Sequence, residues 1–147
     1  MDDQEFIRRF EDQTYPLDEW THRSHVKIAF LYLRDYPFEE AIDRIRKNIK
    51  AFNAKNDIPQ NESSGYNEST TQVFMRLMAT MMNEYEDVLP TPTADDFCDT
   101  HTQLMNWRLL RLFYSPAQRK QTYLNPNEFV KPDLAGLPQQ PDDRKET

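Results

Sequence analysis

Glycine is almost absent from this chain. Only two glycines, Gly65 and Gly136, occur in 147 residues, so few positions can adopt a positive φ at low cost. A fold rich in β-hairpins needs such positions in its tight turns. Helices, in contrast, can be joined through proline and asparagine, which this sequence supplies. The scarcity of glycine therefore favours a helical fold over a β fold.

Apolar residues recur at helical spacing along most of the chain. The clearest case is the segment 37–55, where Phe38, Ile42, Ile45 and Ile49 share one face and charged residues occupy the other. Prolines and capping residues mark where such segments begin and end. The pattern predicts helices over 2–13, 22–36, 37–55, 66–86, 93–114 and 115–123.

The length of the chain fits one domain. We expect an all-α, single-domain bundle of five or six helices over residues 1–137. Residues 125–137 are rich in proline and lack periodicity, which predicts an irregular strap along the bundle. The remaining residues, 138–147, have the polar composition of a disordered tail.

The charge and composition of the chain argue against several classes of partner. A net charge of −7 and a pI near 4.9 are unfavourable for binding a phosphate backbone, so we expect no nucleic-acid partner. No stretch is long and apolar enough to span a bilayer, so we expect no membrane association and a cytoplasmic location. The single cysteine, Cys98, has no second cysteine with which to form an internal disulfide or a metal site.

The segment E-W-T-H-R-S-H contains the most informative polar residues of the sequence. At about 100° per residue, His22 and His25 lie on the same face of their predicted helix as Val26 and Ala29, toward the core. Glu68 is predicted nearer the opposite side of its own helix. The inward-facing polar residues are His22, His25, Asn67, Thr70, His101 and Arg108.

One interpretation of this cluster is a site for a divalent metal such as zinc. Imidazoles that project from facing helices are common ligands in helical bundles. The predicted ligands are His22, His25, Glu68 and His101, with Glu68 contributing only if the first turn of its helix is rotated toward the second helix. Asn67 is a poor ligand for these metals.

A second interpretation is a metal-free pocket for a small anionic or carbonyl-bearing ligand. Imidazole can donate and accept protons near neutral pH. The predicted ligand-binding residues are His22, His25, Asn67, His101 and Arg108, with Tyr66 beside them. No nucleophile stands next to a base in the sequence, so covalent catalysis has little support.

The third interpretation is structural. Histidines near helix N-termini often satisfy a buried carbonyl or carboxylate and do nothing more, and Asn67 can simply cap its helix. In that case the chain is a protein-interaction or regulatory module with a polar core. The sequence leaves these three interpretations open.

Four segments, W-T-H-R-S-H, G-Y-N-E-S-T, L-F-Y-S and V-K-P-D-L-A-G-L-P, resemble a family of small uncharacterised bacterial proteins. That family is marked by W-T-H-x-x-H before an apolar helix, then G-Y-H-E-T, a later histidine upstream of a Y-S pair, and P-D-x-x-P-L-P. The resemblance covers residues 16–138 and implies a shared site, without implying a reaction. The positions it would place there are His22, His25, Glu68, His101, Tyr114 and Ser115. The chain departs at Asn67, where the family pattern has histidine, and this weakens a metal assignment.

Overall fold

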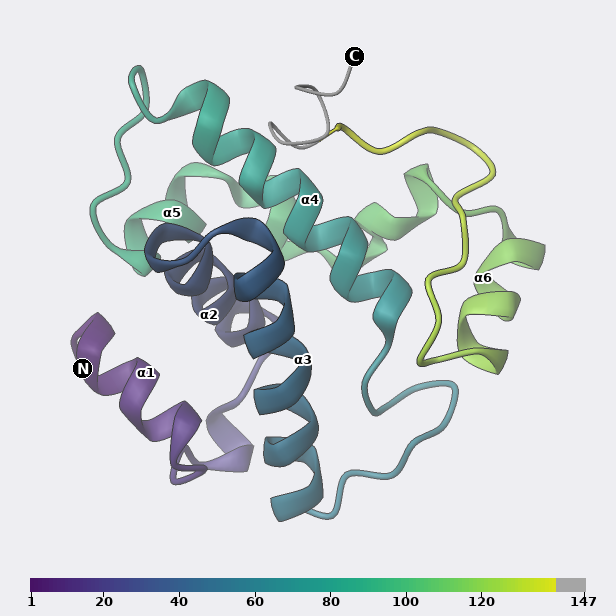
Figure 1. Cartoon of the computed structure of the whole chain (residues 1–147), viewed down its shortest axis with the longest axis horizontal. Helices are drawn as coiled ribbons and strands as arrows, with labels where there is room; N and C mark the ends of the chain where they lie inside the picture. Colours follow the sequence, from purple (N-terminus) through teal and green to yellow (C-terminus); the bar gives the residue numbers. More distant parts are fainter. Residues whose placement is uncertain (140–147) are drawn as a thin grey trace.

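The computed structural model describes residues 1–139, and this part of the chain is helical (Figure 1). A lone β-bridge between Asn61 and Ser64 is the sole β pairing in that range, so the predicted all-α class is confirmed. No helix within residues 1–139 is long and apolar enough to cross a membrane. The α-helices (α) and 3₁₀ helices (η) are, in chain order, α1 (Asp3–Glu11), η1 (Leu17–Glu19), α2 (His22–Asp35), α3 (Phe38–Lys55), α4 (Glu68–Tyr85), α5 (Ala94–Thr100), η2 (Thr102–Met105), η3 (Trp107–Leu112) and α6 (Pro116–Leu124).

Side-chain caps fix where most of these helices begin. The Thr21 hydroxyl accepts a hydrogen bond from the Ser24 backbone N–H, and Ser24 Oγ accepts one from the Thr21 backbone N–H, which forms a capping box at the start of α2. The side chains of Asn67, Thr93 and Ser115 cap α4, α5 and α6, each by accepting a hydrogen bond from the backbone N–H three residues later. These caps set the register of α2 and α4, the two helices that matter most for the site described below.

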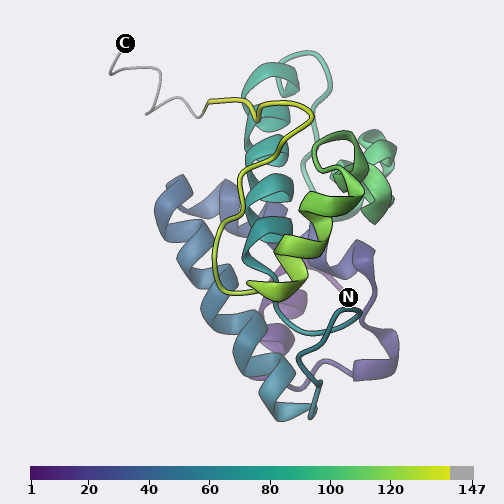
Figure 2. The same ribbon diagram turned by 90° about the vertical axis from the view of Figure 1, so that its right-hand side faces the viewer.

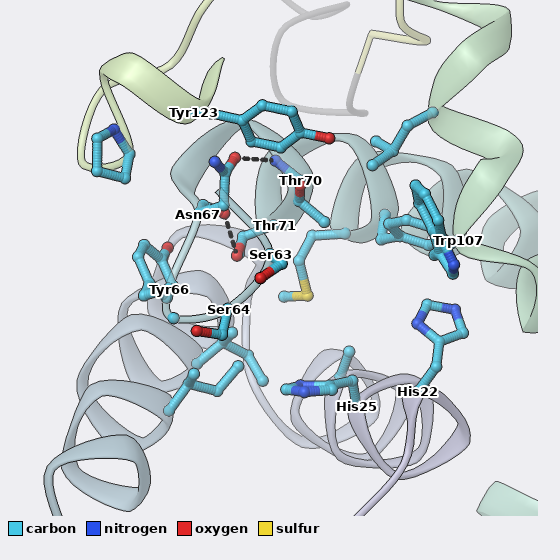
Figure 3. A pocket seen from close by; sticks show the side chains of 18 of the residues that line it. His22, His25, Ser63, Ser64, Tyr66, Asn67, Thr70, Thr71, Trp107 and Tyr123 are labelled. Atoms are coloured by element: carbon cyan, nitrogen blue, oxygen red, sulfur yellow. Dashed lines mark hydrogen bonds between the residues drawn. The ribbon is translucent and has the colours of Figure 1, made fainter. Parts of the chain in front are cut away.

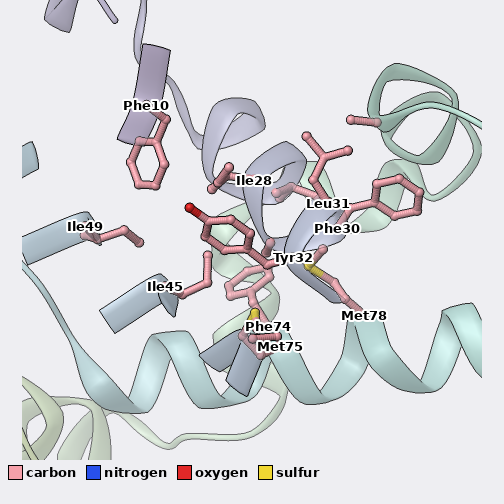
Figure 4. Packing of buried hydrophobic residues seen from close by; sticks show 14 of the residues in the cluster. Phe10, Ile28, Phe30, Leu31, Tyr32, Ile45, Ile49, Phe74, Met75 and Met78 are labelled. Atoms are coloured by element: carbon pink, nitrogen blue, oxygen red, sulfur yellow. The ribbon is translucent and has the colours of Figure 1, made fainter. Parts of the chain in front are cut away.

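Helix α2 runs through the middle of the molecule and packs against α1, α3, α4 and α5. Its residues Ile28, Leu31 and Tyr32 are almost completely buried. Figure 4 shows Ile45 of α3 and Met75 of α4 converging on them. Burying a large apolar side chain stabilises the fold by roughly 1.5–3 kcal/mol, so the aromatic and aliphatic residues around α2 support a substantial core despite the low apolar content.

The predicted helix over 93–114 is wrong, because the segment is divided into three shorter elements. Helix α5 ends at Thr100, and His101 leaves the helical region with φ −105° and ψ 63°. Asn106 then caps η3 by accepting a hydrogen bond from the Arg108 backbone N–H. The bend buries Leu104 completely. Tertiary packing of this residue overrides the local helical pattern.

Residues 125–139 contain no helix and run back along α4 (Figure 2). The Glu68 backbone N–H donates to Pro126 O at 2.7 Å, and the Val130 N–H donates to Ser69 Oγ at 2.9 Å. The Tyr114 hydroxyl donates to Val130 O at 2.6 Å. The segment is thereby fastened to the start of α4. Of the predicted tail 138–147, residues 140–147 lie outside the described residues.

Candidate binding cavity

A cavity of about 620 Å³ lies between α2, α4, η3, α6 and the loop that precedes α4 (Figure 3). Its volume is within the range of pockets that hold small molecules. The side of the cavity toward the core is apolar, whereas hydroxyl, amide and imidazole groups occupy other parts of its wall. The lining residues are His22, His25, Val26, Ala29, Ile45, Ile49, residues 60–67, Thr70, Thr71, Phe74, Met75, Met78, Trp107, Leu110, Tyr123 and Pro126.

His22 is the first residue of α2 and is held by a contact from a distant part of the chain. Its Nε2 lies 2.7 Å from Leu104 O, and its ring meets Phe74 edge-on, with the centroids 5.1 Å apart. A carbonyl oxygen can only accept, so Nε2 carries the hydrogen. In the neutral ring, Nδ1 is then a hydrogen-bond acceptor. Figure 3 shows a ring nitrogen of His22 on the cavity side.

His25 lies one turn further along α2 and has the opposite tautomer. The indole Nε1–H of Trp20 donates to His25 Nε2 at 3.0 Å. Indole is a donor only, so Nε2 is unprotonated and the neutral ring carries its hydrogen on Nδ1. Burial and, to a smaller extent, the neighbouring His22 together lower the pKa of His25 to about 4. His25 is therefore uncharged at neutral pH.

Asn67 lines the cavity, but both polar atoms of its side-chain amide form hydrogen bonds within the protein. Its Oδ1 accepts from the Thr70 backbone N–H at 3.0 Å, and its Nδ2 donates to Thr122 O at 2.9 Å. The first bond caps α4 and the second ties α6 to it. Asn67 therefore positions one wall of the cavity.

The loop over residues 60–66, most of which falls between the helices predicted over 37–55 and 66–86, forms another wall. The Gln60 side chain pairs with the Tyr66 backbone in both directions, donating to its carbonyl at 2.9 Å and accepting from its N–H at 3.0 Å. Gly65 has φ +96°, a conformation that other residues rarely adopt. Ser63 and Ser64, labelled in Figure 3, line the cavity from this loop. The isolated Gly65 was the one sequence signal that this loop has a specific shape.

Glu68 does not line the cavity but belongs to a buried ion-pair cluster beside it. Arg46 Nε and Nη2 donate to its two carboxylate oxygens at 2.8 and 2.7 Å. The Tyr66 hydroxyl donates at 2.6 Å and the Gln72 amide at 2.8 Å. Burial alone would raise the pKa of Glu68, but these hydrogen bonds outweigh it and lower the pKa to about 2. The carboxylate is therefore ionised and anchors the first turn of α4 to α3.

His101 and Arg108 also lie outside the cavity lining. His101 is buried, with its ring centroid 4.7 Å from that of Phe97. Burial lowers its pKa, an effect that the charge of Glu86 partly opposes. Arg108 is exposed, and its guanidinium lies 5.9 Å from the centroid of the Trp107 ring. The structure does not bring these two residues to His22 and His25, because the bend at His101 ends the helix that was to carry them.

The four predicted metal ligands are not arranged around a common point. The Nε2 atom of His22 is hydrogen-bonded to Leu104, and that of His25 to Trp20. Glu68 forms an ion pair with Arg46, and His101 packs against Phe97. Within residues 1–139, no group of three or more histidine, cysteine, aspartate or glutamate side chains is placed to hold a metal ion. The residues present do not fit a zinc-type site.

Cys98 is the strongest intrinsic nucleophile in the chain, and it is remote from the cavity lining. It is completely buried, and burial raises the pKa of its thiol to about 11. The thiol is therefore protonated at neutral pH and inert.

Comparisons with family models, with curated proteins and with solved structures gave no match to this chain. The functional conclusion therefore depends on the geometry of the cavity.

Proposed function

We propose that this chain binds a small, largely apolar molecule in the cavity between α2, α4, η3 and α6. The observation that carries the proposal is a cavity of about 620 Å³ that joins an apolar floor to two imidazoles whose tautomers are fixed. Pockets of this composition are typical of small-molecule sites, where a few polar groups orient an otherwise apolar ligand. Two of the segments that carry the family resemblance, W-T-H-R-S-H (residues 20–25) and G-Y-N-E-S-T (residues 65–70), lie at or beside this cavity, and this supports the proposal of a shared site there.

A cavity-filling substitution tests the proposal. Thr70 lines the cavity and is partly buried, so a phenylalanine at this position occupies the space that the ligand needs. The probe is the neutral naphthyl ketone prodan, whose fluorescence shifts to the blue in an apolar site. We expect wild-type protein to bind prodan and Thr70→Phe to bind it at least about tenfold more weakly, a loss of about 1.4 kcal/mol.

Thr80→Phe is the matched control, because Thr80 lies on the same helix but does not line the cavity. It should bind prodan as the wild type does, with thermal melts showing that both variants are folded. Equal binding by wild type and Thr70→Phe, or none by the wild type, would contradict the proposal.

The second candidate is a protein-interaction or regulatory module with structural histidines. It is favoured by the observation that Nε2 of each ring is used to hold Leu104 or Trp20 in place. Under this proposal, His22→Ala lowers the melting temperature and no small probe binds. The prodan titration therefore separates the two candidates.

A further inference from the structure

The cavity is nearly devoid of charge. Among residues 1–139, Glu62, on the exposed part of the loop, is the one formally charged residue that lines it. No lysine or arginine lines the cavity within residues 1–139, so an anion would find no cation there and would be repelled by Glu62. An ion in contact with the apolar floor would also lose hydration without compensation. The cavity therefore favours an uncharged ligand.

His22 and His25 lie one helical turn apart in the lining of this cavity, and the Nδ1 atom of each ring is not used in a hydrogen bond within residues 1–139. When both rings are neutral, the bond to Leu104 leaves His22 Nδ1 as an acceptor, and the bond from Trp20 leaves His25 Nδ1–H as a donor. No residue within 1–139 forms a hydrogen bond with either Nδ1 atom. Residues three apart on a helix are neighbours, with Cβ atoms about 5–6 Å apart. One small molecule can therefore contact both rings.

The other walls favour a flat ring. Phe74, Trp107 and Tyr123 supply aromatic surface, and Figure 3 shows Trp107 beside His22 and Tyr123 across the cavity from His25. Aromatic side chains bind planar ligands through stacked or edge-on contacts. The amide of Asn67 is already committed to Thr70 and Thr122, so the two histidines are left to set the polar specificity.

We infer that the cavity selects an uncharged planar ring in which an N–H group is next to a carbonyl, as in a lactam or a cyclic imide. The ligand N–H donates to His22 Nδ1, and the ligand carbonyl accepts from His25 Nδ1. This inference rests on the proposed function, since it names the class of molecule that the same cavity takes.

The test compares four probes of similar shape by NMR titration of the ¹⁵N-labelled protein. Quinolin-2(1H)-one carries the lactam, and its N-methyl derivative lacks the donor. Naphthalene lacks both polar groups, and quinoline-2-carboxylate adds a charge. We expect the lactam to bind at least about tenfold more tightly than each of the other three, with shifts at the amides of α2 and residues 60–67.

Two variants test the assignment of donor and acceptor without removing the framework bonds. In His22→Gln, the amide N–H can still donate to Leu104 O, but a carbon atom replaces the acceptor at the δ position. In His25→Gln, the amide oxygen can still accept from Trp20, but a carbon atom replaces the donor at the δ position. Each should weaken lactam binding about tenfold more than it weakens naphthalene binding. His101→Gln, at a buried histidine outside the cavity, is the control and should bind all probes as the wild type does.

The outcomes distinguish failure of this inference from failure of the proposed small-molecule site. If naphthalene and the lactam bind equally well, or if the carboxylate binds best, the inference is wrong and the cavity remains a ligand site. If none of the four probes binds, both are wrong. The N-methyl comparison uses wild-type protein, so the inference stays testable even if a glutamine variant fails to fold.

Discussion

At the scale of single residues, the tautomer of each neutral histidine is determined by the hydrogen-bond partner of its Nε2 atom. His22 donates to Leu104 O, whereas His25 accepts from Trp20, so the two neutral rings carry opposite hydrogen-bonding groups at Nδ1. The same contacts explain why His25 resists protonation. A protonated ring would place N–H against N–H at Trp20, in a site where burial already disfavours charge.

His25 therefore makes stability depend on pH. Its pKa falls from 6.5 in the unfolded chain to about 4 in the folded protein, so the unfolded chain takes up this proton first. The stabilisation is complete above pH 6.5 and is lost as the pH falls toward 4, at up to about 1.4 kcal/mol per pH unit. We expect His25→Gln, measured by urea denaturation from pH 7.5 to 4, to show a shallower loss than the wild type. Identical slopes would show that His25 is protonated as easily in the fold as in the unfolded chain.

At the scale of elements, the loop before α4 depends on one backbone conformation. Gly65 has φ +96°, and a Cβ at this position would lie 2.3 Å from Gln60 Oε1. That oxygen is the acceptor for the Tyr66 N–H. A side chain at residue 65 therefore disturbs both the local backbone and the amide pairing that shapes the cavity wall.

Gly65→Ala should lower the free energy of unfolding by about 1–2 kcal/mol, because of the strained φ and the displaced Gln60 side chain. Gly136→Ala is the matched control, since nothing lies within 4 Å of a Cβ built there. It should change stability by less than about 0.5 kcal/mol. Urea denaturation of the two variants measures the difference, and an equal effect would show that the loop has no specific conformation at Gly65.

The sequence was sufficient to predict most helices but not the full composition of the site. Helices α1, α2, α3 and α4 lie within the segments predicted from apolar periodicity and caps, and α6 extends one residue beyond its predicted segment. The placement of His101 and Arg108 failed because it assumed an unbroken helix, and a helical wheel carries no information once the chain bends. Glu68 was assigned near the polar side of α4, where its burial by Arg46, 22 residues earlier, could not be inferred from local pattern. The roles of Gln60, Ser63 and Ser64 depend on a loop fold that periodicity does not address.

At the scale of the whole molecule, the cavity is assembled by contacts between distant parts of the chain. His22 reaches Leu104, Asn67 reaches Thr122, and the segment after α6 returns to the start of α4 through Ser69. Loop closure over such distances costs entropy that packing must offset. The cavity therefore forms only when most of the chain is folded.

Ser69→Ala tests how firmly the C-terminal segment is held. Ser69 is almost fully buried, and its removal leaves the Val130 N–H without its acceptor, at a cost of about 1–2 kcal/mol. We expect faster hydrogen exchange at the Val130 amide and a lower urea midpoint. Thr102→Ala, at an exposed position, should leave both unchanged. Unchanged exchange at Val130 in Ser69→Ala would show that the segment is held by its other contacts.

The placement of the two tryptophans gives the protein two separate optical signals. Trp107 is 47% exposed and lines the cavity, so its emission should respond to anything that enters. Trp20 lies against Phe10, with ring centroids 4.9 Å apart, and its indole N–H is bonded to His25. An imidazolium ion quenches indole fluorescence, so Trp20 reports the charge of that ring. If one tryptophan at a time is replaced by phenylalanine, intrinsic fluorescence can follow ligand occupancy of the cavity through Trp107 and protonation of His25 through Trp20, without any attached dye.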